Sequence, residues 1–188
     1  RTFGGVNRAW STEEYKTFKE LSYARSQDRI AEIATLARNE GLRLHETLRI
    51  DRATVERALS IGHLHIKGKG GKERDVPLSQ ESRAMLKERI QEVERGDKLY
   101  VRQGEETHLV IKQVQNFLNR NREYFQDESR SQAPSEGDEV IAENITFHGL
   151  RHSYAQERYQ QAIDSGMSDY KARLFVSQLL GHERDDVT

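Results

Sequence analysis

A glycine-rich turn between two alternating segments is the feature that most constrains how this chain can fold. Leu64 and Ile66 alternate with polar residues, residues 68–71 contain three glycines, and residues 73–78 return along the first segment. Alternation with a period of two indicates strands, and glycine permits the backbone angles of a tight turn. Apolar residues elsewhere recur with the helical period. We therefore expect an α+β fold that is mainly helical, with about seven helices and one small antiparallel sheet.

The helical segments are bounded by recognisable start and stop signals. Residues 11–14 form a capping-box pattern at the start of the first helix, and Gly41 is suited to end the second. The expected helices cover residues 12–23, 28–40, 44–50, 79–94, 109–125, 147–163 and 168–180. Residues 52–60 fit either a helix or an extended segment. Residues 99–101 predict a short strand, and residues 1–10 form an irregular lead-in.

Length and composition exclude several classes of protein. The 188 residues suffice for one well-buried domain. Because cysteine is absent, the chain has no disulfide framework, thiolate zinc site or cysteine nucleophile. No apolar run approaches the ~20 residues of a membrane span, and no signal-peptide pattern follows Arg1. We expect a cytoplasmic protein without membrane association, and the start at Arg1 leads us to expect a fragment or excised domain.

The net charge of −1 conceals an uneven distribution. Six acidic residues and one arginine lie in residues 127–143, within a segment at 126–144 that is rich in Ser, Gly and acids. This composition predicts a flexible acidic surface loop. Residues 41–80 instead hold eight basic and five acidic side chains. Weak basic character of this kind gives only modest support for nucleic-acid binding.

Two motifs late in the sequence carry candidate chemistry. His148 and Arg151 are three positions apart, so they share one face of an expected helix. An arginine fork can hold two phosphate oxygens, and an imidazole beside it can donate a further hydrogen bond. His182 follows Gly181, which ends the last expected helix and directs the next side chain outward. Taken alone, each motif also fits an ordinary helix start or helix end.

Upstream residues add positive charge to this set. Arg43 precedes Glu46 by three positions, so the carboxylate can offset the arginine's charge at a helix start and fix its orientation. Lys69 and Lys72 lie in and beside the glycine-rich turn, whose backbone can approach a large anion. The ordinary alternatives are a solvated turn and an ion pair worth ~0.3–0.5 kcal/mol. As a set, these residues suit a phosphodiester whose extra negative charge must be stabilised in a transition state.

A zinc site is the alternative use of the histidines. His148 and His152 have the four-residue spacing of a helical zinc pair. A metalloprotease helix requires glutamate after the first histidine, where this chain has Gly149, and no clear third ligand is evident. We therefore expect no metal and no cofactor, and we interpret His152 as a supporting residue that packs beside the site.

Four segments agree in order and spacing with one known family. Residues 41–46 (GLRLHE), 68–78 (GKGGKERDVPL), 148–155 (HGLRHSYA) and 179–182 (LLGH) resemble the motifs of the tyrosine recombinase catalytic domain, also called the phage integrase family. The resemblance extends from about residue 11 to the end of the chain. It implies the fold of that domain and site-specific DNA recombination or integration through a 3′-phosphotyrosine intermediate.

The resemblance also implies how the phosphate is held. Arg43 and Arg151 would be the phosphate clamps. His148 and His182 would donate hydrogen bonds to the phosphate oxygens, and His148 would also handle the proton of the attacking tyrosine. The guanidinium groups would take the electrostatic role that a metal ion has in other enzymes of phosphoryl transfer.

Proton transfer to the leaving group and support of the clamp fall to other residues. In the same resemblance, Lys69 would be the general acid that protonates the leaving 5′ oxygen, and Lys72 is the second candidate. Glu46 would brace the arginines.

The nucleophile is the part of the family pattern that this sequence lacks. In the family it follows the last histidine motif, but no tyrosine follows His182 before Thr188. Tyr154, Tyr159 and Tyr170 lie inside expected helices. We also expect the 188-residue chain to lack the family's N-terminal core-binding domain. We expect residues 1–188 to be a catalytic-domain fragment that is truncated before the nucleophile and does not cleave DNA covalently.

The expected partner is double-stranded DNA that carries recombination sites. The resemblance implies a full-length protein that assembles as a tetramer on DNA, whereas we expect the isolated chain to be a monomer. Alternatives with the same chemistry are a chromosome-dimer resolvase and a type IB topoisomerase-like enzyme. Two alternatives belong to other classes of protein. One is a non-catalytic double-stranded DNA-binding module that retains the phosphate-binding cage, and the other is a helical protein–protein adaptor.

Overall fold

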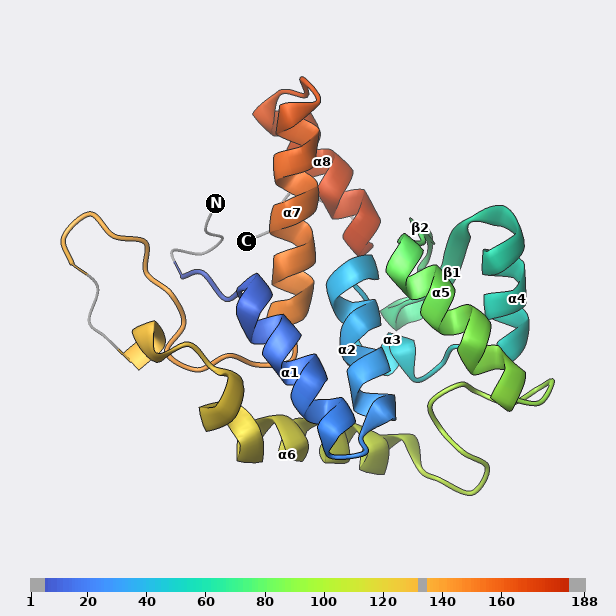
Figure 1. Cartoon of the computed structure of the whole chain (residues 1–188). Coiled ribbons are helices and arrows are strands. Elements are labelled where there is room, and N and C mark those ends of the chain that lie inside the picture. The colour runs from blue at the N-terminus through green and yellow to red at the C-terminus, as the bar shows by residue number, and fades with distance from the viewer. Residues whose placement is uncertain (1–5, 132–134, 183–188) are drawn as a thin grey trace.

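The computed structural model describes residues 6–131 and 135–182. Within these ranges the chain forms eight α-helices and one two-stranded antiparallel sheet (Figure 1). The helices are α1 (Thr12–Ala24), α2 (Asp28–Glu40), α3 (Leu44–Thr47), α4 (Arg52–Ile61), α5 (Gln80–Arg89), α6 (Thr107–Phe125), α7 (Gly149–Asp164) and α8 (Asp169–Leu180), and the strands are β1 (His63–Lys67) and β2 (Glu73–Pro77). Short 3₁₀ turns cover Lys69–Gly71, Ile90–Glu92 and Glu128–Ser131. The predicted fold class is confirmed, and no helix of the described ranges has both the length and the apolar composition needed to cross a membrane.

Helix α2 lies at the centre of the molecule, and nine of its thirteen residues are buried (Figure 1). Ile30 and Ile33 are fully buried, and the helix packs against α1, α3, α5 and α7. Helix α1 begins at the predicted capping box, where the Ser11 hydroxyl accepts from the Glu14 amide and the Glu14 carboxylate accepts from the Ser11 amide. Gly41 ends α2 at a φ of 68°, as its position in the sequence predicts.

Residues 52–60, for which the sequence fits either a helix or an extended segment, belong to helix α4, and Asp51 caps the start of this helix. Its carboxylate accepts a hydrogen bond from the Thr54 amide, and Gly62 ends α4 at a φ of 84°. Strands β1 and β2 follow as the predicted hairpin. Leu64 lies opposite Val76 in the register, and both side chains are buried. The inner face of the hairpin therefore packs on the core, and the turn at its end is exposed to solvent.

The short strand predicted at residues 99–101 is wrong. The neighbouring backbone forms only an isolated bridge between Asp51 and Lys98. Tyr100 turns inward, where it is 2% exposed and donates a hydrogen bond to Glu32 at 3.2 Å. The apolar residues thus pack a loop against α2 and have no strand to pair with.

The lead-in to α1 contributes to the core. Trp10 is buried and stacks on Phe125 at a ring-centroid distance of 5.4 Å. Its backbone amide donates to the Ser153 hydroxyl at 2.8 Å, and its indole Nε1 donates to the Thr146 carbonyl at 2.8 Å. These contacts fix the start of α7, the helix whose first turns carry the predicted histidine and arginine motif.

The described part of the acidic segment is held by one buried arginine. Arg130 forms a two-point ion pair with Glu14, with both bonds at 2.7 Å, and it also donates to the carbonyls of Ala9 and Ala142. Burial alone would raise the pKa of Glu14, but the hydrogen bond from Arg130 and two backbone amides lowers it below its ordinary value. Residues 132–134 lie outside the described ranges, and the mobility of residues 126–144 stays a prediction.

Candidate functional site

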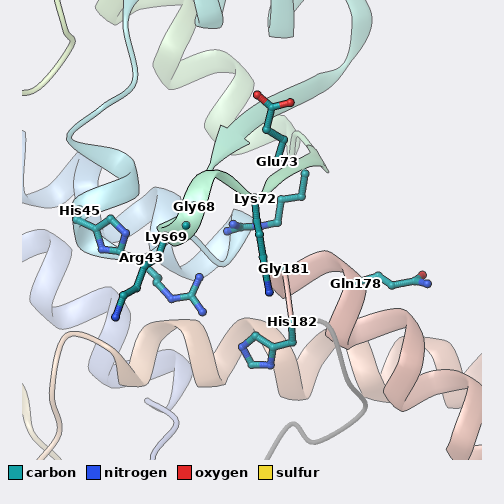
Figure 2. A pocket seen from close by; sticks show the side chains of 11 residues that line it. Arg43, His45, Gly68, Lys69, Lys72, Glu73, Gln178, Gly181 and His182 are labelled. Carbon is teal, nitrogen blue, oxygen red and sulfur yellow. The ribbon is translucent and has the colours of Figure 1, made fainter.

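A basic pocket of about 950 Å³ opens where the β1–β2 turn, the start of α3 and the end of α8 meet (Figure 2). Its lining residues are Arg43, His45, Gly68, Lys69, Gly70, Lys72, Glu73, Arg74, Gln178, Gly181 and His182. Four predicted site residues, Arg43, Lys69, Lys72 and His182, are among them. Figure 2 shows these four side chains around one hollow, with Glu73 directed away from it. The fold therefore gathers polar side chains from three segments that are far apart in the sequence, and two of these segments supply cations.

Arg43 stands immediately before α3, and 28% of its side chain is exposed. The carboxylate of Glu46, which is fully buried one turn later, accepts a hydrogen bond from the Arg43 backbone amide at 2.8 Å. Its Oε2 atom lies 3.6 Å from Nη1 of Arg43. The carboxylate offsets the cation at the helix start and leaves the guanidinium group at the edge of the pocket.

The stronger partner of Glu46 is Arg74. Its Nη1 and Nη2 atoms donate to the two carboxylate oxygens at 2.7 and 2.9 Å, a two-point ion pair. Its Nε atom donates to the Leu179 carbonyl at 3.0 Å. Burial alone would raise the pKa of Glu46, but hydrogen bonds from Arg74 and from the Arg43 amide hold it below its ordinary value. Glu46 is therefore an anion at neutral pH.

Arg151 lies behind the pocket wall and is only 3% exposed. It donates to the Gly41 carbonyl at 2.7 Å and to the Leu180 carbonyl at 2.6 Å, and its Nη1 atom is 4.0 Å from Oε1 of Glu46. Burial, followed by the charges of two neighbouring arginines, lowers its pKa to about 9. Arg151 is still protonated at neutral pH, so its positive charge contributes to the potential of the pocket.

The charges around Glu46 do not balance. Arg43, Arg74 and Arg151 surround this single carboxylate, and Lys69 adds a further cation at the turn. The surplus of positive charge in a partly buried site favours an anionic ligand, because an anion would relieve the repulsion among the guanidinium groups.

His182 is placed by the end of α8. Gly181 adopts a φ of 79°, and the His182 amide donates back to the Ser177 carbonyl at 2.9 Å, which closes the helix and turns the chain as predicted. The Nε2 atom of His182 lies 3.3 Å from Nη2 of Arg151. Since arginine only donates, Nε2 is the acceptor, and a neutral ring then carries its proton on Nδ1.

The lysines lie in the hairpin turn. Gly70 and Gly71 have φ values of 75° and 77°, a region that other residues rarely adopt, and Lys69 and Lys72 flank them. Both lysines are exposed and line the pocket. Their long side chains can therefore follow a ligand at the mouth of the pocket.

His148 lies beside the main pocket, where it lines a smaller hollow of about 200 Å³ together with Arg43 and Gln115. The ring of His152 packs edge-on against it at a centroid distance of 5.3 Å. The His148 side chain is exposed by its solvent-accessible surface area. The protein atoms packed around its ring nevertheless partly desolvate it, which disfavours the charged imidazolium form. The nearby charges of His152 and Arg151 act in the same direction, and the pKa of His148 is lowered to about 4. His148 is therefore neutral at pH 7 and able to accept a proton.

The described residues place neither a metal cluster nor a tyrosine at the pocket. Within residues 6–131 and 135–182, no group of three or more His, Cys, Asp or Glu side chains is arranged to hold a metal ion. None of the chain's seven tyrosines lines either hollow. Tyr154 packs inside the core at 2% exposure, where burial raises its pKa to about 12, and Tyr170 is 64% exposed on α8.

The structure thus brings most of the predicted site residues together. Arg43, Lys69, Lys72 and His182 line the pocket, Glu46 and Arg151 lie behind its wall, and His148 borders the adjoining hollow that shares Arg43. His152 lines neither hollow and packs against His148. Their catalytic roles stay predictions.

Four side chains at the pocket were given no role from the sequence: Arg74, His45, Gln178 and Glu73, of which Glu73 is directed away from the hollow. The sequence signal for Arg74 was its place in the segment 68–78. Its partners, Glu46 and Leu179, lie 28 and 105 positions away, so no local pattern indicates them.

Comparison with known proteins agrees with this arrangement. Residues 12–188 match the model of the Phage integrase family. Over 149 residues the chain is 30% identical to the protein y4rC of Sinorhizobium fredii (strain NBRC 101917 / NGR234), which is described as an integrase/recombinase. The aligned part covers 79% of this chain but only 40% of that relative.

Solved structures of DNA-bound recombinases share the fold. A lambda integrase dimer bound to a COC′ core site superposes with a TM-score of 0.62 at 19% identity, over 96% of this chain and 59% of that one. The XerH site-specific recombinase bound to difH gives 0.60 at 22% identity, over 96% and 49%. The Tn1549 transposon integrase in complex with circular intermediate DNA gives 0.59 at 13% identity, over 98% and 61%. The chain therefore spans between about half and three-fifths of the length of these structures.

Proposed function

Since the chain belongs to the phage integrase family of tyrosine recombinases, we propose that its basic pocket binds the scissile phosphate of double-stranded DNA during site-specific recombination. The observation that carries the proposal is that Arg43 and Arg151 both lie within 4.0 Å of the Glu46 carboxylate, next to a pocket that is also lined by Lys69 and His182. Residues 1–188 would form the catalytic domain, and the complete protein would assemble as a tetramer on its DNA sites.

The proposed reaction divides the work among these residues. Arg43 contacts the phosphate from the pocket edge, and the buried charge of Arg151 stabilises the additional negative charge of the transition state. His182, whose Nε2 atom accepts a hydrogen bond from Arg151, donates a hydrogen bond from Nδ1 to a phosphate oxygen.

The chemical step is a transesterification. A tyrosine Oη attacks the phosphorus, the bond to the 5′ oxygen breaks, and a 3′-phosphotyrosine forms. Neutral His148 accepts the tyrosine proton, and Lys69 gives a proton to the leaving 5′ oxygen, with Lys72 as the second candidate. Because the phosphodiester energy is kept in the covalent bond, attack by a 5′ hydroxyl restores the DNA strand and frees the tyrosine.

We propose that the nucleophile is none of the seven tyrosines of the 188-residue chain. Since none of the seven lines the pocket, we propose that the 188-residue chain binds DNA but forms no covalent adduct by itself. The second candidate function is a non-catalytic module that binds double-stranded DNA through the same phosphate-binding cage, because binding needs only the cations of the pocket.

Salt-dependent DNA binding tests the proposal. Fluorescence anisotropy with a duplex oligonucleotide should show affinity that falls steeply with salt, and R43A should lower the slope of log K against log salt by ~0.9, the value for one phosphate contact. R83K is the control, because Arg83 is exposed and does not line the pocket. Affinity that does not respond to salt, or an equal slope for R43A, would contradict the proposal.

A suicide DNA substrate separates the two candidate functions. The 188-residue chain should yield no covalent adduct on denaturing gels. An adduct formed by the protein as its gene encodes it would establish the recombinase, whereas DNA binding without any adduct in that protein would establish the binding module.

A further inference from the structure

Arg74 joins three parts of the pocket. It belongs to β2, directly after the lysine-bearing turn, it holds Glu46 of α3, and it donates to the Leu179 carbonyl of α8. We propose that Arg74 is the positioning residue of this site. By binding both oxygens of Glu46, Arg74 leaves the guanidinium group of Arg43 available to contact the DNA phosphate. This inference rests on the proposed function and adds a residue to it.

The distances show how Glu46 divides its contacts. Both of its oxygens accept short bonds from Arg74, at 2.7 and 2.9 Å, whereas the nearest guanidinium nitrogens of Arg43 and Arg151 lie 3.6 and 4.0 Å away. A buried carboxylate requires strong donors, and it would draw in another arginine if its present partner were lost. In the native site, Arg74 meets that requirement, and Arg43 stays extended toward the pocket.

The packing around Arg74 leaves little room for another arrangement. A methyl group on Gly68 would lie 3.0 Å from Oε2 of Glu46 and 3.7 Å from Nη1 of Arg74. A methyl group on Gly181 would lie 3.1 Å from Cδ of Arg74. Glycines on two walls of the pocket therefore make space for the same ion pair. Arg74 thereby ties the turn that carries Lys69 to the helix end that carries His182.

Arg74 itself is poorly placed to bind the phosphate as a main contact. Only 7% of its side chain is exposed, and three of its five N–H groups are taken by Glu46 and Leu179. Its effect on DNA would therefore pass through Arg43, and this distinguishes a positioning residue from a direct ligand.

The experiment measures duplex DNA affinity against salt for variants of the 188-residue chain. R74K keeps the positive charge but cannot hold two oxygens at once. The E46Q/R74K double variant also removes the carboxylate charge that would attract Arg43. R130K is the matched control, because Arg130 forms an equally buried two-point pair with Glu14 away from the pocket. Wild type and R43A, measured in the same buffers, define the full and the reduced slope, and thermal melting reports stability.

We expect R74K to bind about tenfold more weakly at moderate salt, with a slope lowered by ~0.9 as in R43A, because Arg43 turns to Glu46. The double variant should recover the wild-type slope, since a neutral amide no longer competes for Arg43. R130K should lose stability and keep its slope. If R74K behaves like R130K, or if the double variant fails to recover the slope, the positioning role is excluded while the proposed function stands. If wild type shows no salt-dependent binding, both fail.

Discussion

The Arg151 guanidinium group donates a hydrogen bond to the backbone carbonyl of Gly41 at 2.7 Å, although 110 positions separate the two residues. A second bond reaches the carbonyl of Leu180. Gly41 ends α2 and Leu180 is the last residue of α8, so Arg151 lies between two helix C-termini, where unpaired carbonyls carry partial negative charge. Backbone dipoles therefore help to stabilise this buried cation, whose contact with the Glu46 carboxylate is a long one of 4.0 Å, and its charge stays available to an anionic ligand.

Replacing Arg151 with lysine should destabilise the protein by about 2–4 kcal/mol, because the single nitrogen of lysine cannot occupy both positions from which Nη1 and Nη2 donate to the two carbonyls, and its charge stays buried. Chemical denaturation at pH 7 measures the loss. Arg83 supplies the control, since it also donates to a backbone carbonyl, that of Leu59, but is exposed. R83K should change stability by less than about 0.5 kcal/mol. Equal effects of the two substitutions would contradict the role assigned to the buried bonds.

A pair of glycine substitutions should separate backbone strain from crowding. Gly41 and Gly62 both end helices at positive φ, but a methyl group on Gly41 would lie 2.4 Å from the Tyr154 ring, whereas one on Gly62 would meet nothing within 4 Å. G62A should cost about 1–2 kcal/mol for the left-handed backbone alone. G41A should cost about 1–3 kcal/mol more, because the buried ring cannot move aside. Urea unfolding of both variants checks this, and similar values would show that Tyr154 yields.

Glu40 should make stability fall as pH rises toward 8. Burial raises the pKa of this fully buried carboxyl from 4.5 to about 8, and the Ser79 and Ser82 hydroxyls donate to it. The folded state therefore holds a proton that the unfolded state releases, so the stabilisation is complete below pH 4.5 and is lost as pH rises through 8. The loss has a limiting slope of about 1.4 kcal/mol per pH unit.

The substitution E40Q mimics the protonated form and should flatten this dependence. The variant should be more stable than wild type at pH 8 and nearly equal to it at pH 4.5. E81Q provides a control of opposite sign, because hydrogen bonds from Lys19 and Asn39 outweigh burial and lower the pKa of Glu81. Thermal melting at several pH values tests both, and parallel curves for E40Q and wild type would rule out Glu40 as the titrating group.

Binding of DNA should take up protons at His148. Its pKa of about 4 leaves it neutral in the free protein, and a phosphate beside it would raise that pKa. Affinity should therefore increase as pH falls from 7 to 5, by at most about tenfold per pH unit for each proton taken up. H148N should reduce this dependence, whereas H63N, at an exposed histidine on β1 that does not line the pocket, should leave it unchanged. Equal pH profiles for wild type and H148N would contradict the prediction.

Local signals in the sequence predicted the elements that depend on neighbouring residues. The capping box at residues 11–14, the glycine that ends α2 and the hairpin around residues 68–71 each depend on contacts within a few positions, and the structure confirms all three. The strand expected at residues 99–101 failed because Tyr100 is held by Glu32, which a local pattern cannot indicate.

The candidate site was also predicted only in part. Motif order predicted which charged residues would meet, and Arg43, Lys69 and His182 do line one pocket. The sequence did not indicate that Arg151 would be buried between two helix ends, or that Arg74 would take the carboxylate expected to serve Arg43. Both outcomes depend on how elements that are distant in the sequence pack together. The identity of a residue as arginine does not indicate whether its side chain lies at the surface or in the interior.

The bond from Arg74 to the Leu179 carbonyl has a consequence for synthesis on the ribosome. Translation proceeds from the N-terminus, so α3 and the hairpin emerge well before α8 is made. While α8 is still inside the ribosome, Arg74 lacks its acceptor, the Leu179 carbonyl. Arg151 then lacks both the Leu180 carbonyl and the imidazole of His182. The phosphate-binding cage is therefore completed only after α8 has emerged, and ribosome-bound intermediates that lack α8 should have less affinity for nucleic acid than the folded domain.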